Sequence, residues 1–371
     1  MKIAILGTRG IPSGYSGYEA FAEEISTRMV NGGHELIVYA HKNMIRNKVK
    51  YYRGVRLYYL PSLRGKNTSQ FSNSLISTLH VIFIKRPDIV LFCNAANGPF
   101  GLLLKLAGIK CAINVDGLEW LRPKWSNLAK KYFKFSALLA TKFFNVIVTD
   151  AKGMRDIYKK EFNCDSVNIA YGANPSFSEN PDLLKDFNIT LNQYYLIASR
   201  LVPDNNADLI IDAFLKSNSK LKLAIAGGTN YKNDFEMKLR AIKDNRLVFL
   251  GHIDSSEVIK ELHCNAFAYI HGHQFGGTNP ALLKALAYGN CILALDTVFN
   301  REVLDNGKYG ILFEKNVNSL VDKINYLEAN QNEVEKFRNI SRERIIENYT
   351  WEKITNQYID LFNKMLSNQK L

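Results

Sequence analysis

Short apolar runs alternate with segments of helical length along the whole chain, and this alternation constrains the fold more than any other feature. In the first half, the runs are residues 2–6, 35–40, 55–60, 88–92, 110–115, 145–149 and a further candidate at 167–170. In the second half, they are residues 194–199, 221–227, 246–251, 266–270, 291–295 and 310–313. Uninterrupted apolar strands separated by helices indicate a parallel sheet covered on both faces. We therefore expect an α/β protein with two Rossmann-like domains and a cleft between them, with ligands beyond the carboxyl ends of the strands.

The boundary between the halves falls in residues 171–182, YGANPSFSENPD, which combine two prolines with a glycine and small polar residues. A chain of 371 residues also exceeds what one hydrophobic core usually organises. We expect an N-terminal domain over 1–172 and a C-terminal domain over 173–349. The last segment, 350–371, is expected to be a helix that packs back on the N-terminal domain. Its predicted docking stripe is Trp351, Ile354, Tyr358, Leu361 and Met365.

Cysteine usage and hydropathy indicate the compartment. The five cysteines lie far apart in apolar stretches and form no CxxC pair, which favours a reducing cytoplasm over a disulfide framework or a metal cage. The N-terminal stretch MKIAILGTRG lacks the long apolar run of a signal peptide. No window approaches the ~18 uncharged apolar residues that a membrane span needs. We expect a cytoplasmic protein, soluble or peripheral at the inner face of the plasma membrane.

Charge is distributed very unevenly along the chain. Residues 1–172 hold 25 Lys and Arg against 11 Asp and Glu, whereas residues 173–371 hold 23 against 24. An excess of this kind favours a polyanionic partner, which could be nucleic acid, an anionic bilayer or a phosphorylated acceptor. Solubility alone is the other interpretation. Nucleic acid is not supported, because the sequence contains no nucleic-acid recognition motif and no pattern of aromatic and basic residues on a sheet.

The first strand is followed by a glycine-rich loop. The stretch GTRGIPSGYSGYEAF covers residues 7–21 and contains no GxGxxG, and the second strand ends YAHK without an acidic residue for a ribose. Both features disfavour an NAD(P) enzyme. A glycine-rich loop before a helix can offer backbone N–H groups to an anion or to sugar hydroxyls. A purely structural turn is an equally good interpretation of this loop.

Charged and aromatic residues follow the fifth strand. The stretch INVDGLEWLRPKW places Asp116, Glu119, Trp120 and Arg122 at the carboxyl edge of the sheet. Carboxylates bind hydroxyls and an aromatic face packs on a sugar ring, so this set suits a sugar. The structural alternative is a helix N-cap at Asp116 and a half-buried Trp120.

The segment 124–144 is predicted to be an amphipathic helix. Two interpretations remain open: an interfacial helix drawn to anionic headgroups, and a crossover helix with one core face and one solvated face. Lysines 130, 131 and 134 lie off the apolar face. That face consists of Trp125, Leu128, Tyr132, Phe135, Leu139 and Phe143.

The second domain carries two loops that suit a diphosphate. Arg200 directly follows a strand, where a guanidinium can bind a diphosphate with two parallel hydrogen bonds. A surface salt bridge is the alternative. The stretch IHGHQFGGTNPALL, residues 270–283, places two glycines before a short helix with Asn279 as N-cap and Pro280 at its first position. His271 and His273 lie just upstream, but without a third ligand they do not predict a zinc site.

Together these stretches resemble a known family. The chain is similar over nearly its whole length to GT-B glycosyltransferases of the retaining class called family four, and most closely to bacterial rhamnosyltransferases that build capsule or O-antigen repeat units. The resemblance is most specific in GTRGIPSGYSGYEAFAEE, VLFCNAANGPFGLLLKLAGIK, NVDGLEW, KWSNLAKKYFKFS, TDAKG, RLVPDNN and HGHQFGGTNPALL.

The resemblance implies a division of labour between the domains. The C-terminal domain would bind a nucleotide sugar, dTDP-rhamnose, and the N-terminal domain a saccharide on a polyprenyl diphosphate at an anionic membrane surface. No cofactor or metal is implied. The implied catalytic residues are Asp116, Glu119 and Arg200. The implied donor-binding residues are Gly14, Gly17, Arg200, Asn205, His271, Gly276, Gly277, Thr278, Asn279 and Lys284. The implied acceptor-binding residues are Tyr18, Glu19, Trp120 and Arg122.

The sequence departs from the family pattern at several of these positions. Gly276 and Lys284 stand where many relatives carry two glutamates, and Val115 stands where a histidine precedes the aspartate. Many family members carry a lysine shortly after the residue that matches Arg200. This lysine is missing here, and Asn205 and Asn206 lie in its region. Besides rhamnosyl transfer, two alternatives follow: another hexose or N-acetylhexosamine donor, and a non-catalytic subunit of a polysaccharide-assembly complex.

Overall fold

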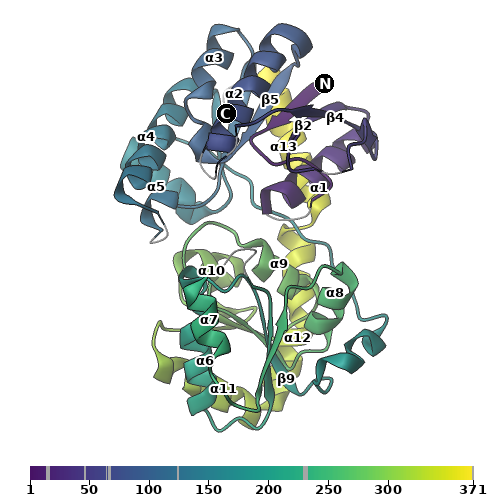
Figure 1. The fold of residues 1–371 in the computed structure, drawn as a ribbon, viewed down its shortest axis with the longest axis vertical. Coiled ribbons are helices and arrows are strands. Elements are labelled where there is room, and N and C mark those ends of the chain that lie inside the picture. The colour runs from purple at the N-terminus through teal and green to yellow at the C-terminus, as the bar shows by residue number, and fades with distance from the viewer. Residues whose placement is uncertain are drawn as a thin grey trace. The chain divides into compact units, whose positions relative to one another are not determined.

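The computed structural model describes residues 1–13, 17–45, 47–63, 65, 68–122, 125–228 and 233–369. These residues form two compact α/β units, and Figure 1 shows a sheet with flanking helices in each. Unit 1 combines Met1–Tyr171 with Trp351–Leu371, and unit 2 is Gly172–Thr350. The predicted fold class of two parallel-sheet α/β domains is confirmed. In the part of the chain that the structure describes, no helix combines the length and apolarity needed to cross a membrane.

The sheet of unit 1 has the strand order β3-β4-β2-β1-β5-β6-β7-β8. Its strands are β1 (Lys2–Leu6), β2 (Glu35–His41), β3 (Tyr51–Tyr52), β4 (Val55–Leu60), β5 (Ile89–Cys93), β6 (Lys110–Val115), β7 (Val146–Thr149) and β8 (Val167–Asn168). Neighbouring strands pair in parallel, except that β3 and β4 form an antiparallel hairpin at one edge. The sequence analysis did not predict β3, because a strand of two residues is too short to show a period.

Helices cover both faces of this sheet. They are α1 (Gly17–Asn31), α2 (Thr68–His80), which continues into the π-helical turn η1 (Val81–Lys85), α3 (Phe100–Leu106), α4 (Asn127–Phe143), α5 (Lys152–Phe162) and α13 (Trp351–Leu366). The chain crosses from β1 to β2 in one direction along the sheet, and from β4 through β5 and β6 to β7 in the other. Because such crossovers are right-handed, α2, α3 and α4 lie on the face opposite to α1.

Helix α4 buries the side that the sequence analysis did not expect. Its buried residues are Ser136, Ala137 and Ala140, whereas Tyr132 and Phe135 of the large apolar stripe are exposed. The contact is close because it involves small residues: a Cβ on Gly98 would lie 1.9 Å from the Ser136 carbonyl oxygen. Helix α4 is thus a crossover helix between β6 and β7, as one interpretation expected, but the large apolar stripe is not its core face, because Leu139 and Phe143 are only half-buried.

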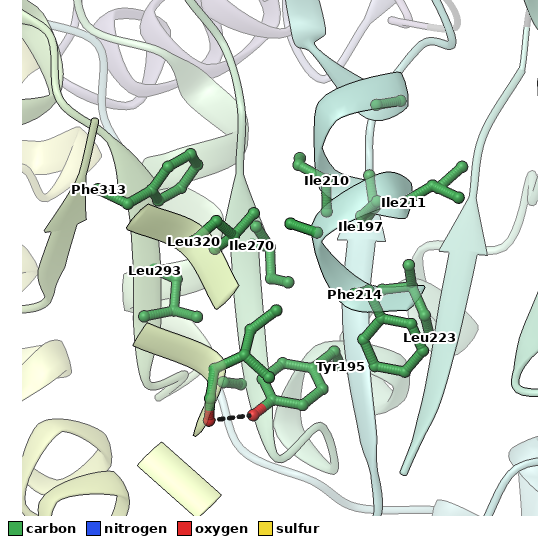
Figure 2. Packing of buried hydrophobic residues seen from close by; sticks show 14 of the residues in the cluster. Tyr195, Ile197, Ile210, Ile211, Phe214, Leu223, Ile270, Leu293, Phe313 and Leu320 are labelled. Atoms are coloured by element: carbon green, nitrogen blue, oxygen red, sulfur yellow. Dashed lines mark hydrogen bonds between the residues drawn. The ribbon is translucent and has the colours of Figure 1, made fainter. Parts of the chain in front are cut away.

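Unit 2 contains a parallel sheet of order β11-β10-β9-β12-β13-β14. Its strands are β9 (Tyr194–Ala198), β10 (Lys222–Ala226), β11 (Leu247–Gly251), β12 (Ala268–His271), β13 (Ile292–Leu295) and β14 (Ile311–Phe313). Its helices are α6 (Ala207–Lys216), α7 (Asp234–Arg240), α8 (Ser256–Cys264), α9 (Pro280–Ala287), α10 (Val298–Val303), α11 (Val317–Ala329) and α12 (Gln331–Asn348). Figure 2 shows its core, where Tyr195 packs edge-on against Phe214 with ring centroids 5.9 Å apart.

The segment predicted as a linker is docked on unit 2. The Ala173 amide donates to the Tyr349 carbonyl at 2.8 Å, and the Ser176 amide donates to the Ala287 carbonyl at 3.0 Å. Its prolines and small polar residues therefore belong to an extended segment that packs against unit 2.

Helix α13 belongs to unit 1 although it is the last helix of the chain. All five residues of its predicted stripe are buried. The ring of Phe21 on α1 lies 5.3 Å from that of Tyr358, and the Asn114 side-chain amide donates to the Tyr358 hydroxyl at 2.8 Å. This buried hydrogen bond connects α13 to β6.

We predict that Tyr358→Phe lowers the free energy of unfolding by about 1–3 kcal/mol, because it leaves the buried Asn114 amide without its acceptor. Urea denaturation monitored by fluorescence measures the loss. Tyr326→Phe is the matched control, since Tyr326 is exposed on α11. Equal stability of the two variants would contradict the assigned role of this hydrogen bond.

Candidate functional site

Each unit collects its polar loops at the carboxyl ends of its parallel strands, which is where ligands bind in open α/β sheets. In unit 1 these loops follow β1 and β6. In unit 2 they follow β9 and β12. The two sets are described separately.

The glycine-rich loop of unit 1 is tightly packed. Gly7 has a φ of +86°, and a Cβ on it would lie 2.4 Å from the Cys93 carbonyl oxygen. Glu19 is buried on α1 and accepts a hydrogen bond from the Arg9 amide at 3.1 Å. Glu19 therefore holds the loop in place, rather than standing open to an acceptor. Gly17 opens α1, and Gly14 lies outside the described residues.

Asp116 lies between two tyrosines at the end of β6. The Tyr171 hydroxyl donates to Asp116 Oδ2 at 2.9 Å, and the Asp116 amide donates to the Tyr18 hydroxyl at 3.2 Å. Burial, followed by the negative charge of Asp116, raises the pKa of Tyr18 and of Tyr171 well above the ordinary value. Both side chains therefore remain protonated, and together they fix the orientation of the half-buried Asp116.

Sequence reasoning missed Tyr171, because it assigned this residue to the linker. The signal that could have identified it is its position directly after the apolar run 167–170. A residue there reaches the same sheet edge as Asp116.

Glu119, Trp120 and Arg122 form a closed structural cluster after Asp116. Glu119 pairs with Arg122, with 3.1 Å between Oε1 and Nε. The Trp125 indole donates to the other Glu119 oxygen at 2.5 Å. The short 3-10 turn over Glu119–Leu121 directs Trp120 inward, where its ring contacts those of Tyr158 and Phe162. Trp120 is thus a core residue, buried more deeply than the structural alternative expected, and does not offer an open face to a sugar. The helix N-cap that this alternative placed at Asp116 is wrong, since Leu118 precedes the 3-10 turn.

In unit 2, the loops after β9 and β12 are held together by asparagines. Asn205 donates to the Arg200 carbonyl at 2.7 Å, and its Oδ1 lies 2.8 Å from His273 Nδ1. Asn206 donates to the Gly272 carbonyl at 2.8 Å. Gly272 is required there, since a Cβ would lie 2.3 Å from the Asn205 carbonyl oxygen. These contacts fix the backbone of Arg200 relative to the loop that contains His273.

The side chain of Arg200 is exposed. Of the carboxylates that the structure describes, none forms a salt bridge with it. Arg200 therefore does not form the surface salt bridge of the alternative interpretation with any described carboxylate. An exposed, unpaired guanidinium remains available to an anionic ligand.

The turn before α9 explains which amides could meet that ligand. As predicted, Asn279 is the N-cap and Pro280 opens the helix. The Asn279 side chain accepts from the Ala281 amide at 2.8 Å, and its carbonyl accepts from the Leu282 and Leu283 amides at 3.1 Å. Since proline has no N–H, all amides of the first turn of α9 are used within the helix. These helix amides are therefore not available to a phosphate.

The turn itself retains unpaired donors. Gly276 has a φ of +119°, which favours glycine, and residues 276–278 are buried. No described residue accepts a hydrogen bond from the amides of Gly276, Gly277 or Asn279. Buried amides are almost always paired in proteins. These three amides therefore form the better candidate for an anion site. Thr278 is also buried in this turn, and Lys284 is exposed on α9.

His271 is the last residue of β12 and precedes this turn by five residues. Burial lowers the pKa of its imidazole to about 3, so the ring is neutral at physiological pH. Its Nδ1 lies 3.3 Å from the Tyr269 hydroxyl, and its Nε2 has no partner among the described residues. In the described ranges, no group of three or more His, Cys, Asp or Glu residues is arranged to hold a metal ion.

The two units define the GT-B fold. Sucrose-phosphate synthase from Thermosynechococcus elongatus superposes with a TM-score of 0.81, at 14% identity, over 99% of each chain. HepE from Anabaena in complex with UDP superposes with a TM-score of 0.78, at 14% identity, over 98% of this chain and 100% of that chain. At such low identity the likeness concerns the fold alone.

Sequence comparison identifies the second unit more narrowly. Residues 184–344 match the family described as Glycosyl transferases group 1, and residues 76–174 match a domain of unknown function, DUF1972. The chain is 27% identical over 171 residues to poly(ribitol-phosphate) alpha-N-acetylglucosaminyltransferase from Staphylococcus aureus (strain COL), which is 44% of this chain and 34% of that relative. The chain thus spans about a third of the relative's length. The chain has the GT-B fold, and residues 184–344 of its second unit match the group 1 glycosyltransferases.

We predict that stability falls on acidification partly through His271. Its folded pKa lies below the ordinary 6.5, so the unfolded chain takes up the proton first and stability is lost as pH falls below that value. Between pH ~6 and ~5, His271→Gln should reduce the slope of the unfolding free energy by about 1 kcal/mol per pH unit. Urea denaturation at each pH measures the slope, with the exposed His252→Gln as control. An unchanged slope in His271→Gln would contradict a neutral, buried imidazole.

Proposed function

We propose that the chain is a glycosyltransferase that transfers a sugar from a nucleotide-sugar donor bound to unit 2. One observation carries this proposal: the Arg200 guanidinium and the Gly276 and Gly277 amides have no partner among the described residues, and they lie within residues 184–344, which match the group 1 glycosyltransferases. Arg200 would bind the diphosphate through two parallel hydrogen bonds, and the amides would neutralise the charge that develops as it leaves. Preorganised donors of this kind are a catalytic device that needs no metal ion.

The donor-binding role extends to the residues that hold these groups in place. Asn205 fixes the backbone of Arg200, and Asn279 fixes the turn by capping α9. The Nε2 of His271, which has no partner among the described residues, is a further candidate to contact the donor. Lys284 would lie near the nucleotide, at the position where many relatives hold the ribose with a glutamate.

The acceptor is proposed to bind unit 1, with Asp116 as the group that orients it. The Tyr171 hydroxyl donates to this carboxylate, and the Tyr18 hydroxyl accepts from the backbone amide of Asp116 at the sheet edge. Glu119 and Arg122 support the neighbouring turn. The resemblance to capsule and O-antigen enzymes favours a saccharide on a polyprenyl diphosphate. The excess of basic residues in unit 1 supports a diphosphate-bearing acceptor at an anionic membrane.

Retention would follow from attack on the face that the diphosphate leaves. The bond between the anomeric carbon and the phosphate oxygen breaks while the acceptor oxygen bonds to that carbon. The acceptor proton passes to the departing phosphate oxygen, so no separate base is required.

Two donors are supported by different observations. The resemblance of sequence stretches such as NVDGLEW favours dTDP-rhamnose. The relative named an N-acetylglucosaminyltransferase and the neighbour solved with UDP favour a UDP-sugar.

Thermal shift with a panel of dTDP- and UDP-sugars should separate these donors. The true donor stabilises by about 2.7 kcal/mol at a hundredfold excess over its Kd. Release of the nucleoside diphosphate in the presence of a lipid-linked acceptor then measures transfer. A panel without any stabilising nucleotide sugar would contradict the proposed function, and binding without turnover would indicate a non-catalytic subunit.

We predict that Arg200→Ala lowers kcat/KM by about 100-fold or more, because it removes a donor aimed at the leaving group. The free energy of unfolding should change by less than ~0.5 kcal/mol, since the side chain is exposed. Arg200→Lys should recover only part of the lost kcat/KM, because lysine keeps the positive charge but cannot form two parallel hydrogen bonds with the diphosphate. Lys220→Ala, an exposed change elsewhere in unit 2, is the control. Full activity of Arg200→Ala with a large loss of stability would assign Arg200 a structural role.

A further inference from the structure

Three neighbouring helices of unit 1 expose large apolar side chains to solvent. Helices α2 and α3 contact each other, as do α3 and α4, and Figure 1 shows all three in one layer of the unit. Phe83 on η1 is 74% exposed, Leu106 on α3 is 77% exposed and Leu128 on α4 is 80% exposed. Ile84 and Phe135 extend this surface, which we call the apolar helical face.

Folding of unit 1 does not explain this arrangement. Helix α2 buries small polar residues, including Asn73, whose side chain donates to the Leu60 carbonyl at 3.0 Å. Helix α4 buries Ser136 and two alanines. Both helices thus place small or polar residues against the sheet and large apolar residues outside. This is the reverse of an ordinary surface helix. Large exposed apolar residues gathered on neighbouring helices in this way mark an interaction site.

The charge around this face has one sign. The helices α2, α3 and α4 and the turn η1 contain no Asp or Glu and hold six lysines: Lys85, Lys105, Lys130, Lys131, Lys134 and Lys142. One of them, Lys134, pairs with Glu161 of α5. Unit 1 as a whole holds 28 Lys and Arg against 13 Asp and Glu, a formal charge of +15, whereas unit 2 holds 20 against 22, a charge of −2.

We propose that the apolar helical face docks on an anionic lipid bilayer. The apolar side chains would enter the boundary between headgroups and acyl chains, and the lysines would contact lipid phosphates. A second copy of the chain fits less well, because a symmetric contact would bring the lysines of both copies together. This inference deepens the membrane-linked part of the proposed function. It requires no sugar donor, so the two can be contradicted separately.

The test is sedimentation of the full chain with vesicles of neutral phosphatidylcholine, and with vesicles that also contain about 30% phosphatidylglycerol. Binding should be at least about tenfold stronger to the anionic vesicles, and it should weaken between about 50 mM and about 500 mM salt. The double variants Phe83→Ser/Leu106→Ser and Lys105→Glu/Lys131→Glu should each lose about tenfold in affinity.

Matched controls are exposed residues of unit 2. Val298→Ser/Ile346→Ser and Lys220→Glu/Lys238→Glu should bind vesicles like the unaltered chain. Thermal melting shows that each variant is folded, and a nucleotide-sugar thermal shift shows that unit 2 retains its donor site. Equal binding to neutral and anionic vesicles, or unchanged binding by the unit 1 variants, would overturn the proposal. Self-association that Phe83→Ser/Leu106→Ser abolishes would assign the face to a second copy instead.

Discussion

The capping of α9 by Asn279 decides which backbone amides of unit 2 can meet a ligand. Asn279 uses its side chain and its carbonyl to satisfy the first amides of the helix, and Pro280 has none to offer. The donors that remain are those of the preceding turn, where glycines allow a close approach and a positive φ. Everything proposed for the donor site depends on this assignment, because Arg200 alone would bind any anion. The asparagine contacts that join the loops after β9 and β12 then hold the backbone of Arg200 in a fixed relation to the loop that contains His273.

In unit 1, too, internal hydrogen bonds decide which polar groups of the loops can meet a ligand. Its loops after β1 and β6 also lie at a carboxyl edge, but most of their polar side chains satisfy one another. Glu119 is engaged by Arg122 and Trp125, and Glu19 by the glycine-rich loop. Asp116 differs, because two protonated tyrosines orient it. We therefore propose Asp116 as the carboxylate of unit 1 that acts on a substrate, supported by the hydrogen-bonded cluster around it.

Much of the fold followed from the sequence, because strands buried on both faces are recognised as apolar runs bounded by helices. Every predicted run became a strand, whereas β3 did not appear in the pattern because it has only two residues. The orientation of side chains was harder to predict. The apolar stripe of α4 suited a core face by its period, but Gly98 and Ser136 allow so close a packing that the small side of the helix turns inward. Trp120 and Tyr171 show the same difficulty, since their roles depend on Tyr158 and Asp116, which lie far from them in the sequence.

A crystal structure of the chain with its nucleotide-sugar donor tests the central claim most directly. The account predicts that the donor diphosphate lies within hydrogen-bond distance of the Arg200 guanidinium and of the Gly276 and Gly277 amides. A diphosphate bound elsewhere, with this turn still closed and Arg200 still in solvent, would contradict it.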